Sequence, residues 1–362
     1  MKPLLTVLAA LLVMGTLGGP SLAQSDLSDS QTRQFHGWTV VCNNVGDCVA
    51  YSQGEDFGQG WVQIRMAAGP RAQPQVLFGD WPDERAVPTA VRVDGQPLRI
   101  AVVTPDRLYT QAIDPRAAVA AMALGQRLVL ALPGAEADPQ GAEVSLAGVS
   151  ATLLWIDERQ GRLNTTTALI RRGVQPASAV PPARPAAPVR AGPAVSQAGL
   201  PTTPPGALEL LPVVQACDED TSFHQSASLV RREVARLSDD TLLWSVLCSM
   251  GAYNQGSRFF LTDASGADPR PLQLPQTRQR WDEELTEADR LTYINAGYDP
   301  GSRTLTTFAK ARGLGDCGLI ATWVWTGEAF VLAEERVMNV CAGMTFDLWP
   351  VTWLSADQSL IG

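Results

Sequence analysis

A proline-rich stretch in the middle of the chain most constrains what this sequence can fold into. Residues 176–212 hold ten of the 26 prolines, together with many Ala, Gly, Ser and Thr. Proline lacks a backbone donor, and this composition has too few apolar side chains to bury a core. We therefore predict two domains, 30–173 and 208–362, joined by an extended, semi-stiff linker over 174–207. Such domains can sit apart or fold back on each other.

The first residues have the order of an export signal. Lys2 is followed by the apolar run 4–17 and by small residues at Ser21 and Ala23. The run is shorter than the ~20 residues that span a bilayer. We predict a signal peptide over 1–23 that is cleaved after Ala23. The expected location is the periplasm, with no transmembrane segment after the signal is removed.

Six cysteines favour the same compartment, because an even number in an exported chain indicates disulfides. No two have the spacing of a redox motif or a zinc knuckle. Two precede the linker and four follow it, so pairing within domains leaves three patterns. We favour the sequential one, and the sequence leaves the other two open. The favoured pairs are Cys42–Cys48, Cys217–Cys248 and Cys317–Cys341.

The charge argues against nucleic acid as a partner. Loss of Lys2 with the signal leaves 27 basic against 37 acidic residues, a net charge of −10. Phosphate backbones repel such a chain, and no basic stripe offsets the repulsion. Lys310 is then the one lysine of the mature protein.

Runs of β-branched and aromatic residues predict an α+β fold in both halves, with antiparallel sheet dominant and one or two helices per domain. Asp114 before Pro115 predicts a helix start, and Asp94-Gly95 predicts a hairpin turn. The predicted strands are 38–42, 48–51, 61–66, 76–78, 127–132, 165–170, 242–250, 257–262 and 304–308, with hairpins over 91–100 and 320–333. The predicted helices are 115–124, 148–157 and 226–237.

Several motifs resemble one exported bacterial family, domain of unknown function 1176, over nearly the whole mature chain. The matching residues are 156–162, 248–254, 310–318, Trp323, Trp325, 341–343 and 349–350. Two positions depart from the family pattern: Ala342, where Arg is expected, and Ala311, where Gly is expected. The N-terminal half, through 38–42, Cys48 and 144–148, is similar to the invasion-associated locus B family. That resemblance implies a β-sandwich-like envelope domain, and neither family implies a chemistry.

The search for chemistry predicts no catalytic residue, no metal site and no cofactor. The chain lacks a Gly-x-Ser-x-Gly elbow, and its two histidines, His36 and His224, are expected at the surface. The acidic clusters at 218–220 and 263–268 lack the spacing of a calcium loop and are expected to be solvated turns. Asp157 is instead expected to support the helix end, with Gln160 and Arg162 making a local polar network.

The candidate binding residues lie in 310–325. Lys310, Arg312 and Asp316 belong to a glycine-rich turn that either has only a conformational role or presents its two cations to an anionic partner. In the first case Gly313 and Gly315 supply positive φ. Trp323 and Trp325 share one face of a strand. Exposed, they would stack on wall sugars, whereas buried they would fill a core, which we favour.

These patterns predict a non-catalytic periplasmic binding or structural protein of the cell envelope, acting on cell-wall glycan or on an envelope protein. Two modules on a flexible tether would gain avidity from matched spacing. An envelope hydrolase acting on cell-wall material, or an inhibitor of a secreted enzyme, are the alternatives.

Overall fold

The computed structural model describes residues 31–54, 60–80, 87–103, 109–131, 141–219, 232–275, 277 and 290–356. The expected signal peptide and His224 lie outside these residues. Within them, no helix is long and apolar enough to cross a membrane. All the sheets are antiparallel, and helices are few, so the fold is the expected β-rich α+β class.

In its described residues, the N-terminal half contains two sheets and two helices. The larger sheet runs in the order β1 (Gln31–Phe35), β2 (Trp38–Cys42), β3 (Cys48–Gln53), β4 (Trp61–Met66), β5 (Pro74–Gly79), β9 (Tyr109–Ala112) and β8 (Ile100–Val102). The smaller sheet runs in the order β11 (Ala142–Ser145), β10 (Arg127–Ala131), β6 (Ala90–Val93) and β7 (Gln96–Leu98). Helices α1 (Pro115–Leu124) and α2 (Val149–Arg159) join both sheets in one apolar core.

Local signals in this half formed as predicted, with one exception. The Asp114 carboxylate caps α1 by accepting a hydrogen bond from the Ala117 amide at 3.0 Å. Asp94 and Gly95 turn the β6–β7 hairpin with positive φ. The strand predicted over 165–170 is wrong, because this segment forms turns. Its backbone amides hydrogen-bond to the carboxylate of Asp157 instead of to a neighbouring strand.

The C-terminal half contains two further sheets. One runs in the order β12 (Arg232–Ser238), β13 (Thr241–Met250), β14 (Gln255–Asp263) and β15 (Arg270–Pro271), with β16 (Tyr293–Ile294) also paired to β14. The other runs in the order β17 (Gly297–Asp299), β18 (Thr304–Lys310), β19 (Gly318–Trp325), β20 (Phe330–Met338) and β21 (Val351–Leu354). An apolar core that includes Leu243, Phe259 and Trp323 lies between them.

The helix predicted over 226–237 is wrong where the structure describes it, because 232–238 is strand β12. Val234 and Leu237 have helix-like spacing, but they serve opposite faces of a strand. Val234 packs beside the cluster of helices α3 (Gly206–Glu209) and α4 (Pro212–Glu219). Leu237 is buried in the core between the sheets. Because both faces of this strand are buried, its apolar residues have the spacing that is typical of one apolar face of a helix.

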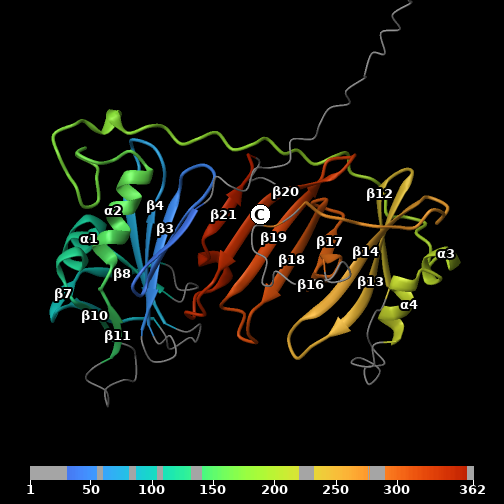
Figure 1. Cartoon of the computed structure of the whole chain (residues 1–362), viewed down its shortest axis with the longest axis horizontal. Helices are drawn as coiled ribbons and strands as arrows, with labels where there is room; N and C mark the ends of the chain where they lie inside the picture. The colour runs from blue at the N-terminus through green and yellow to red at the C-terminus, as the bar shows by residue number, and fades with distance from the viewer. Residues whose placement is uncertain are drawn as a thin grey trace, which may run out of the picture.

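The predicted linker is extended but is not a tether. Residues 184–200, which we call the strap, cross from the N-terminal half over the β17–β21 sheet to β12 (Figure 1). The Arg184 amide donates to the Val45 carbonyl at 3.0 Å, and the Gly192 amide donates to the Trp325 carbonyl at 2.8 Å. Val189 is 5% exposed in a small apolar cluster of its own. These contacts hold the strap against the folded protein. The expectation of a flexible tether is therefore wrong, and the avidity argument that rests on it is lost.

The two halves also share a buried interface. The outer face of the large N-terminal sheet packs against residues 338–349 in a common apolar cluster. The fully buried Gln63 amide donates to the Leu348 carbonyl at 2.9 Å. Asn44 donates to the Leu354 carbonyl at 2.8 Å and accepts from its amide at 2.9 Å. The domain boundaries at 173 and 208 stay predictions, but the halves do not sit apart.

Three disulfides link the sequential pairs Cys42–Cys48, Cys217–Cys248 and Cys317–Cys341, which is the pattern that the sequence favoured. No cysteine of the chain is left unpaired. The first closes the β2–β3 hairpin, the second joins α4 to β13, and the third joins the start of β19 to the segment after β20.

Candidate binding face

Three segments that are far apart in the sequence meet beside the Cys317–Cys341 disulfide. They are the β13–β14 turn, the β18–β19 turn and the segment after β20. The Asn254 Nδ2 donates to the Lys310 carbonyl at 2.9 Å, and the Tyr253 hydroxyl donates to the Ala311 carbonyl at 3.3 Å. The Asn295 Nδ2 donates to the Asn254 Oδ1 and to the Phe308 carbonyl, both at 2.8 Å. These side chains fix the β18–β19 turn against the neighbouring sheet.

Arg312 and Asp316 close the β18–β19 turn from within. Two guanidinium nitrogens of Arg312 lie 2.7 and 2.5 Å from the carboxylate oxygens of Asp316, and a third contact reaches the Cys341 carbonyl at 3.1 Å. The Gly343 amide donates to the same carboxylate at 2.8 Å. Asp316 is 1% exposed. The charge of Arg312 is therefore compensated inside the turn, as the conformational interpretation expected.

The pKa of Asp316 reflects this arrangement. Burial opposes ionisation, but the hydrogen bonds from Arg312 and from the Gly343 amide outweigh it and lower the pKa of the carboxyl. The ion pair raises the pKa of Arg312 in return.

Glycine is required at two positions of this turn. Gly315 has φ +67°, as predicted, and Gly318 has φ +142°, with the Ala309 carbonyl oxygen 2.0 Å from where a Cβ would lie. Gly313 was expected to share this conformation and does not.

Exposed apolar side chains gather around the turn. Tyr253, Leu314 and Phe346 are 42%, 53% and 57% exposed, three of the nine large apolar side chains that are exposed in the described residues. The half-buried Phe308 stacks edge-on against Phe346, with ring centroids 6.2 Å apart. The Lys310 ammonium lies 5.4 Å from the Phe308 ring centroid. We call these five residues the apolar face.

The structure does not bring Trp323 and Trp325 to this face. They are 1% and 5% exposed and belong to the core between the two C-terminal sheets. The Trp323 indole donates to the Pro275 carbonyl at 3.0 Å, and Trp325 packs on Phe330 at 5.2 Å. Trp323 and Trp325 are therefore core residues, as we favoured, and neither is available to stack on a sugar.

Sequence reasoning missed Tyr253, Leu314 and Phe346. One signal was present at Leu314, a large apolar residue between two glycines in a turn that closes a hairpin. Phe346 had no comparable signal, because only the fold brings its segment beside β18.

The other candidate groups have structural partners in the described part of the chain. Asp218 pairs with Arg232 at 2.9 Å, and Asp263 closes its own turn on the Ser265 and Ala267 amides. His36 occupies the β1–β2 turn with positive φ. One carboxylate lies near two sulfurs, Asp316 beside Cys317 and Cys341, but those sulfurs form a disulfide. We therefore assign no metal to this cluster.

The expected contact between Gln160 and Arg162 is present at the end of α2, whereas the Asp157 carboxylate bonds to a segment further along the chain. The buried Asp157 carboxylate accepts from the Leu169 amide at 2.7 Å and the Ile170 amide at 2.9 Å. The fully buried Arg162 donates to the Gln160 Oε1 at 2.6 Å and to the Gly69 carbonyl at 2.8 Å. It therefore holds the segment after α2 to the β4–β5 turn, which is a structural role.

These features define a class of disulfide-linked, mainly antiparallel-β proteins with one rigid, partly apolar face. The chain belongs to the family described as protein of unknown function DUF1176, whose model matches residues 32–356. It is 29% identical to the uncharacterized protein YpfG of Escherichia coli K12 over 342 residues, 89% of this chain and 92% of that protein.

A solved structure of invasion associated protein B from Bartonella henselae is also similar. It matches 36% of this chain and 99% of its own, at 19% identity and a TM-score of 0.28. This level of likeness carries no argument about function.

Proposed function

We propose that this protein is a non-catalytic, periplasmic binding protein that recognises another envelope protein through the apolar face. The observation that carries the proposal is the exposure of Tyr253, Leu314 and Phe346 on a rigid backbone. A disulfide, an ion pair and two asparagines hold that backbone in place. Pre-organised apolar side chains bind with little loss of conformational entropy, and such anchors supply much of the affinity of protein interfaces.

A protein partner suits this face better than a wall glycan. The tryptophans that would have stacked on sugars are buried, whereas Leu314 and Phe346 offer an apolar contact of the kind that protein interfaces use. The apolar face carries one charge, the Lys310 ammonium. Unlike Arg312, Lys310 has no carboxylate partner within the turn. It favours a partner that places an acidic side chain beside its apolar contact.

The periplasmic location belongs to the same proposal. Its support is the signal expected over 1–23 and the three disulfides, which form and persist in oxidising compartments. An inhibitor of a secreted enzyme would be one form of this function, with the enzyme as the partner.

The test compares capture by the oxidised mature protein and by two variants from a detergent-free envelope extract. Leu314→Asp and Phe346→Asp place a carboxylate on the apolar face. Leu124→Asp is the matched control, because Leu124 is 90% exposed on α1 in the N-terminal half. We expect a defined partner to bind wild type and the control, and to bind each face variant about tenfold less.

Equal capture by all four proteins would overturn the proposal. So would sedimentation of wild type with purified cell-wall sacculi, which would indicate a wall-binding module. Release of soluble sugar–peptide fragments from the sacculi would indicate a hydrolase instead. Circular dichroism of each variant checks that the fold is retained.

A further inference from the structure

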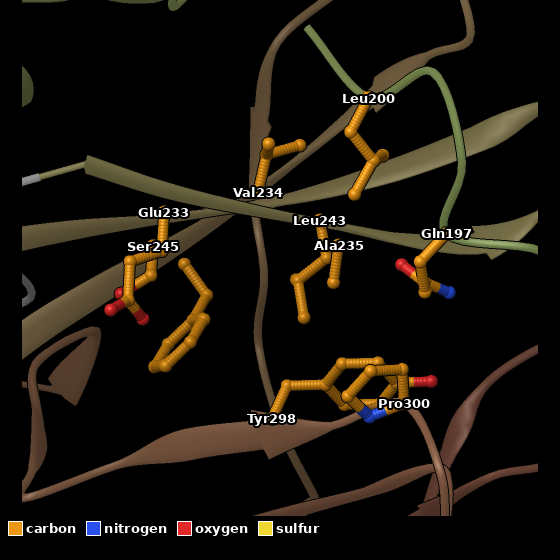
Figure 2. Close-up of a pocket in the computed structure, with 10 residues that line it drawn as sticks. Gln197, Leu200, Glu233, Val234, Ala235, Leu243, Ser245, Tyr298 and Pro300 are labelled. Atoms are coloured by element: carbon orange, nitrogen blue, oxygen red, sulfur yellow. The ribbon is translucent and has the colours of Figure 1, made fainter. Parts of the chain in front are cut away.

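A hollow lies away from the apolar face, between the two C-terminal sheets. Its volume is about 370 Å³, which is in the range of small-molecule pockets. Strands β12–β14 line one side, and Tyr298 and Pro300 line the other (Figure 2). Leu200 and Gln197 of the strap border it, at the top and at the right of that view.

The strand register explains why this pocket has an apolar part and a polar part. Ala235 pairs with Leu243, and Glu233 pairs with Ser245, so these four side chains form two rows on one face of the sheet. Ser245 also pairs with Phe259. The apolar core between the sheets therefore continues into the pocket through Leu243 and Phe259 and ends at the polar pair Glu233 and Ser245.

The strap fixes one border of the pocket. The Gln197 side-chain amide donates to the Arg236 carbonyl at 2.9 Å and accepts from the Arg236 amide at 2.8 Å. It thereby covers part of the edge of β12 in the way that another strand would. These two hydrogen bonds fix the position of Gln197, and with it the border that the strap gives to the pocket.

Two polar groups that line the pocket lack protein partners, and one of them, Glu233, is also exposed to solvent. Among the described residues, the Glu233 carboxylate has no ion pair or hydrogen bond, and Glu233 is the one charged side chain that lines the hollow. The Tyr298 hydroxyl likewise has no hydrogen-bond partner in the described ranges. Burial raises the pKa of Tyr298 to about 12, so its hydroxyl keeps the proton at neutral pH.

We propose that this pocket binds a small organic cation, an amine or ammonium group on an apolar body. The charge would lie against Glu233, where Ser245 accepts an N–H hydrogen bond. The apolar body would fit between Leu243 and Phe259 on one sheet and the Tyr298 ring on the other. An anion of the same shape would meet the carboxylate of Glu233 with nothing to offset the repulsion. The proposal is independent of the apolar face.

Titration calorimetry of the mature protein at neutral pH tests this with three probes of one shape. They are phenethylamine, the neutral phenethyl alcohol and the anionic 3-phenylpropanoate. We expect saturable binding of the amine, weaker binding of the alcohol and none of the anion. Glu233→Gln should weaken amine binding about tenfold. Ala235→Phe should abolish it by filling the pocket.

Glu158→Gln is the matched control, since Glu158 is an exposed carboxylate on α2 in the other half, and it should bind the amine as wild type does. Leu314→Asp should also leave amine binding unchanged, which separates this proposal from the proposed function. Equal affinity of wild type and Glu233→Gln would overturn the proposal. Preference for the anion, or no saturable amine binding up to about 10 mM, would also overturn it.

Discussion

Asp157 shows how one carboxylate determines the path of a loop. It is completely buried and accepts hydrogen bonds from the backbone amides of Leu169, Ile170 and Arg171. These amides have no sheet or helix partner, so the carboxylate takes the place of a neighbouring strand.

Asp157→Ala should therefore lower the free energy of unfolding by about 3 kcal/mol, because it leaves buried donors unsatisfied. Asp157→Asn, which keeps one acceptor oxygen, should cost less. Urea unfolding followed by tryptophan fluorescence measures both. The matched exposed change Glu158→Gln should have no effect, and a loss below about 1 kcal/mol in Asp157→Ala would contradict this role.

Asp316 makes stability depend on pH. Its folded pKa is lowered, so its contribution is fully present above the unfolded pKa of about 4 and is lost as the pH falls through the folded value. Asp316→Asn should be about 2 kcal/mol less stable than wild type at pH 7. The difference should shrink steadily below about pH 4. Urea unfolding at several pH values measures it, and a difference that is constant with pH would argue against the ionised pair.

Some of these residues were predictable and others were not. Gln160 and Arg162 were expected to interact, and they do, because they are close in sequence. The partners of Asp157 lie a dozen residues further on, and no local pattern points to them. Trp323 and Trp325 were expected on one face of a strand, but only the opposing sheet determines that the face is buried.

At the scale of elements, hairpins were predictable because turn residues and alternation agree. The β19–β20 hairpin and the β6–β7 turn formed as expected. Strand β12 did not, because burial on both faces gave it the spacing of a helix. The strap was correctly expected to be extended. Its contacts were not predictable, since they are scattered backbone hydrogen bonds and isolated side chains such as Val189.

The strap should resist proteolysis while it is docked. Gly192→Ala would place a Cβ 2.6 Å from the Gly327 amide nitrogen and should lift the strap from the β19–β20 turn. We expect trypsin to cut after the exposed Arg190 about tenfold faster in this variant. Gly206→Ala, where a Cβ meets nothing within 4 Å, is the control. Equal cleavage rates in both variants would contradict a docked strap.

At the scale of the molecule, the large N-terminal sheet is covered on both faces. Strand β2 shows this directly, because all five of its residues are buried. An uninterrupted apolar strand indicates two covered faces. The run that predicts strand β2 therefore also indicates a second element on its outer side.

Met344→Asp should separate the two halves. Met344 is fully buried in the shared cluster, and an unpaired charge there should cost about 3 kcal/mol or more. We expect one calorimetric unfolding transition in wild type and two in the variant, with a larger radius of gyration by small-angle scattering. Leu124→Asp should behave as wild type. One transition and an unchanged radius for Met344→Asp would show that the interface is not needed to hold the halves together.

The strap also places the two C-terminal sheets in an order in space that differs from their order along the chain. Along the chain, the β12–β16 sheet precedes the β17–β21 sheet, but in space the later sheet lies next to the N-terminal half (Figure 1). A growing chain therefore completes its N-terminal half long before residues 338–354 emerge to cover the outer face. Through most of synthesis that face remains open to chaperones and to other nascent chains. The sequential disulfides suit this order, because the first cysteine of each pair is followed along the chain by its own partner.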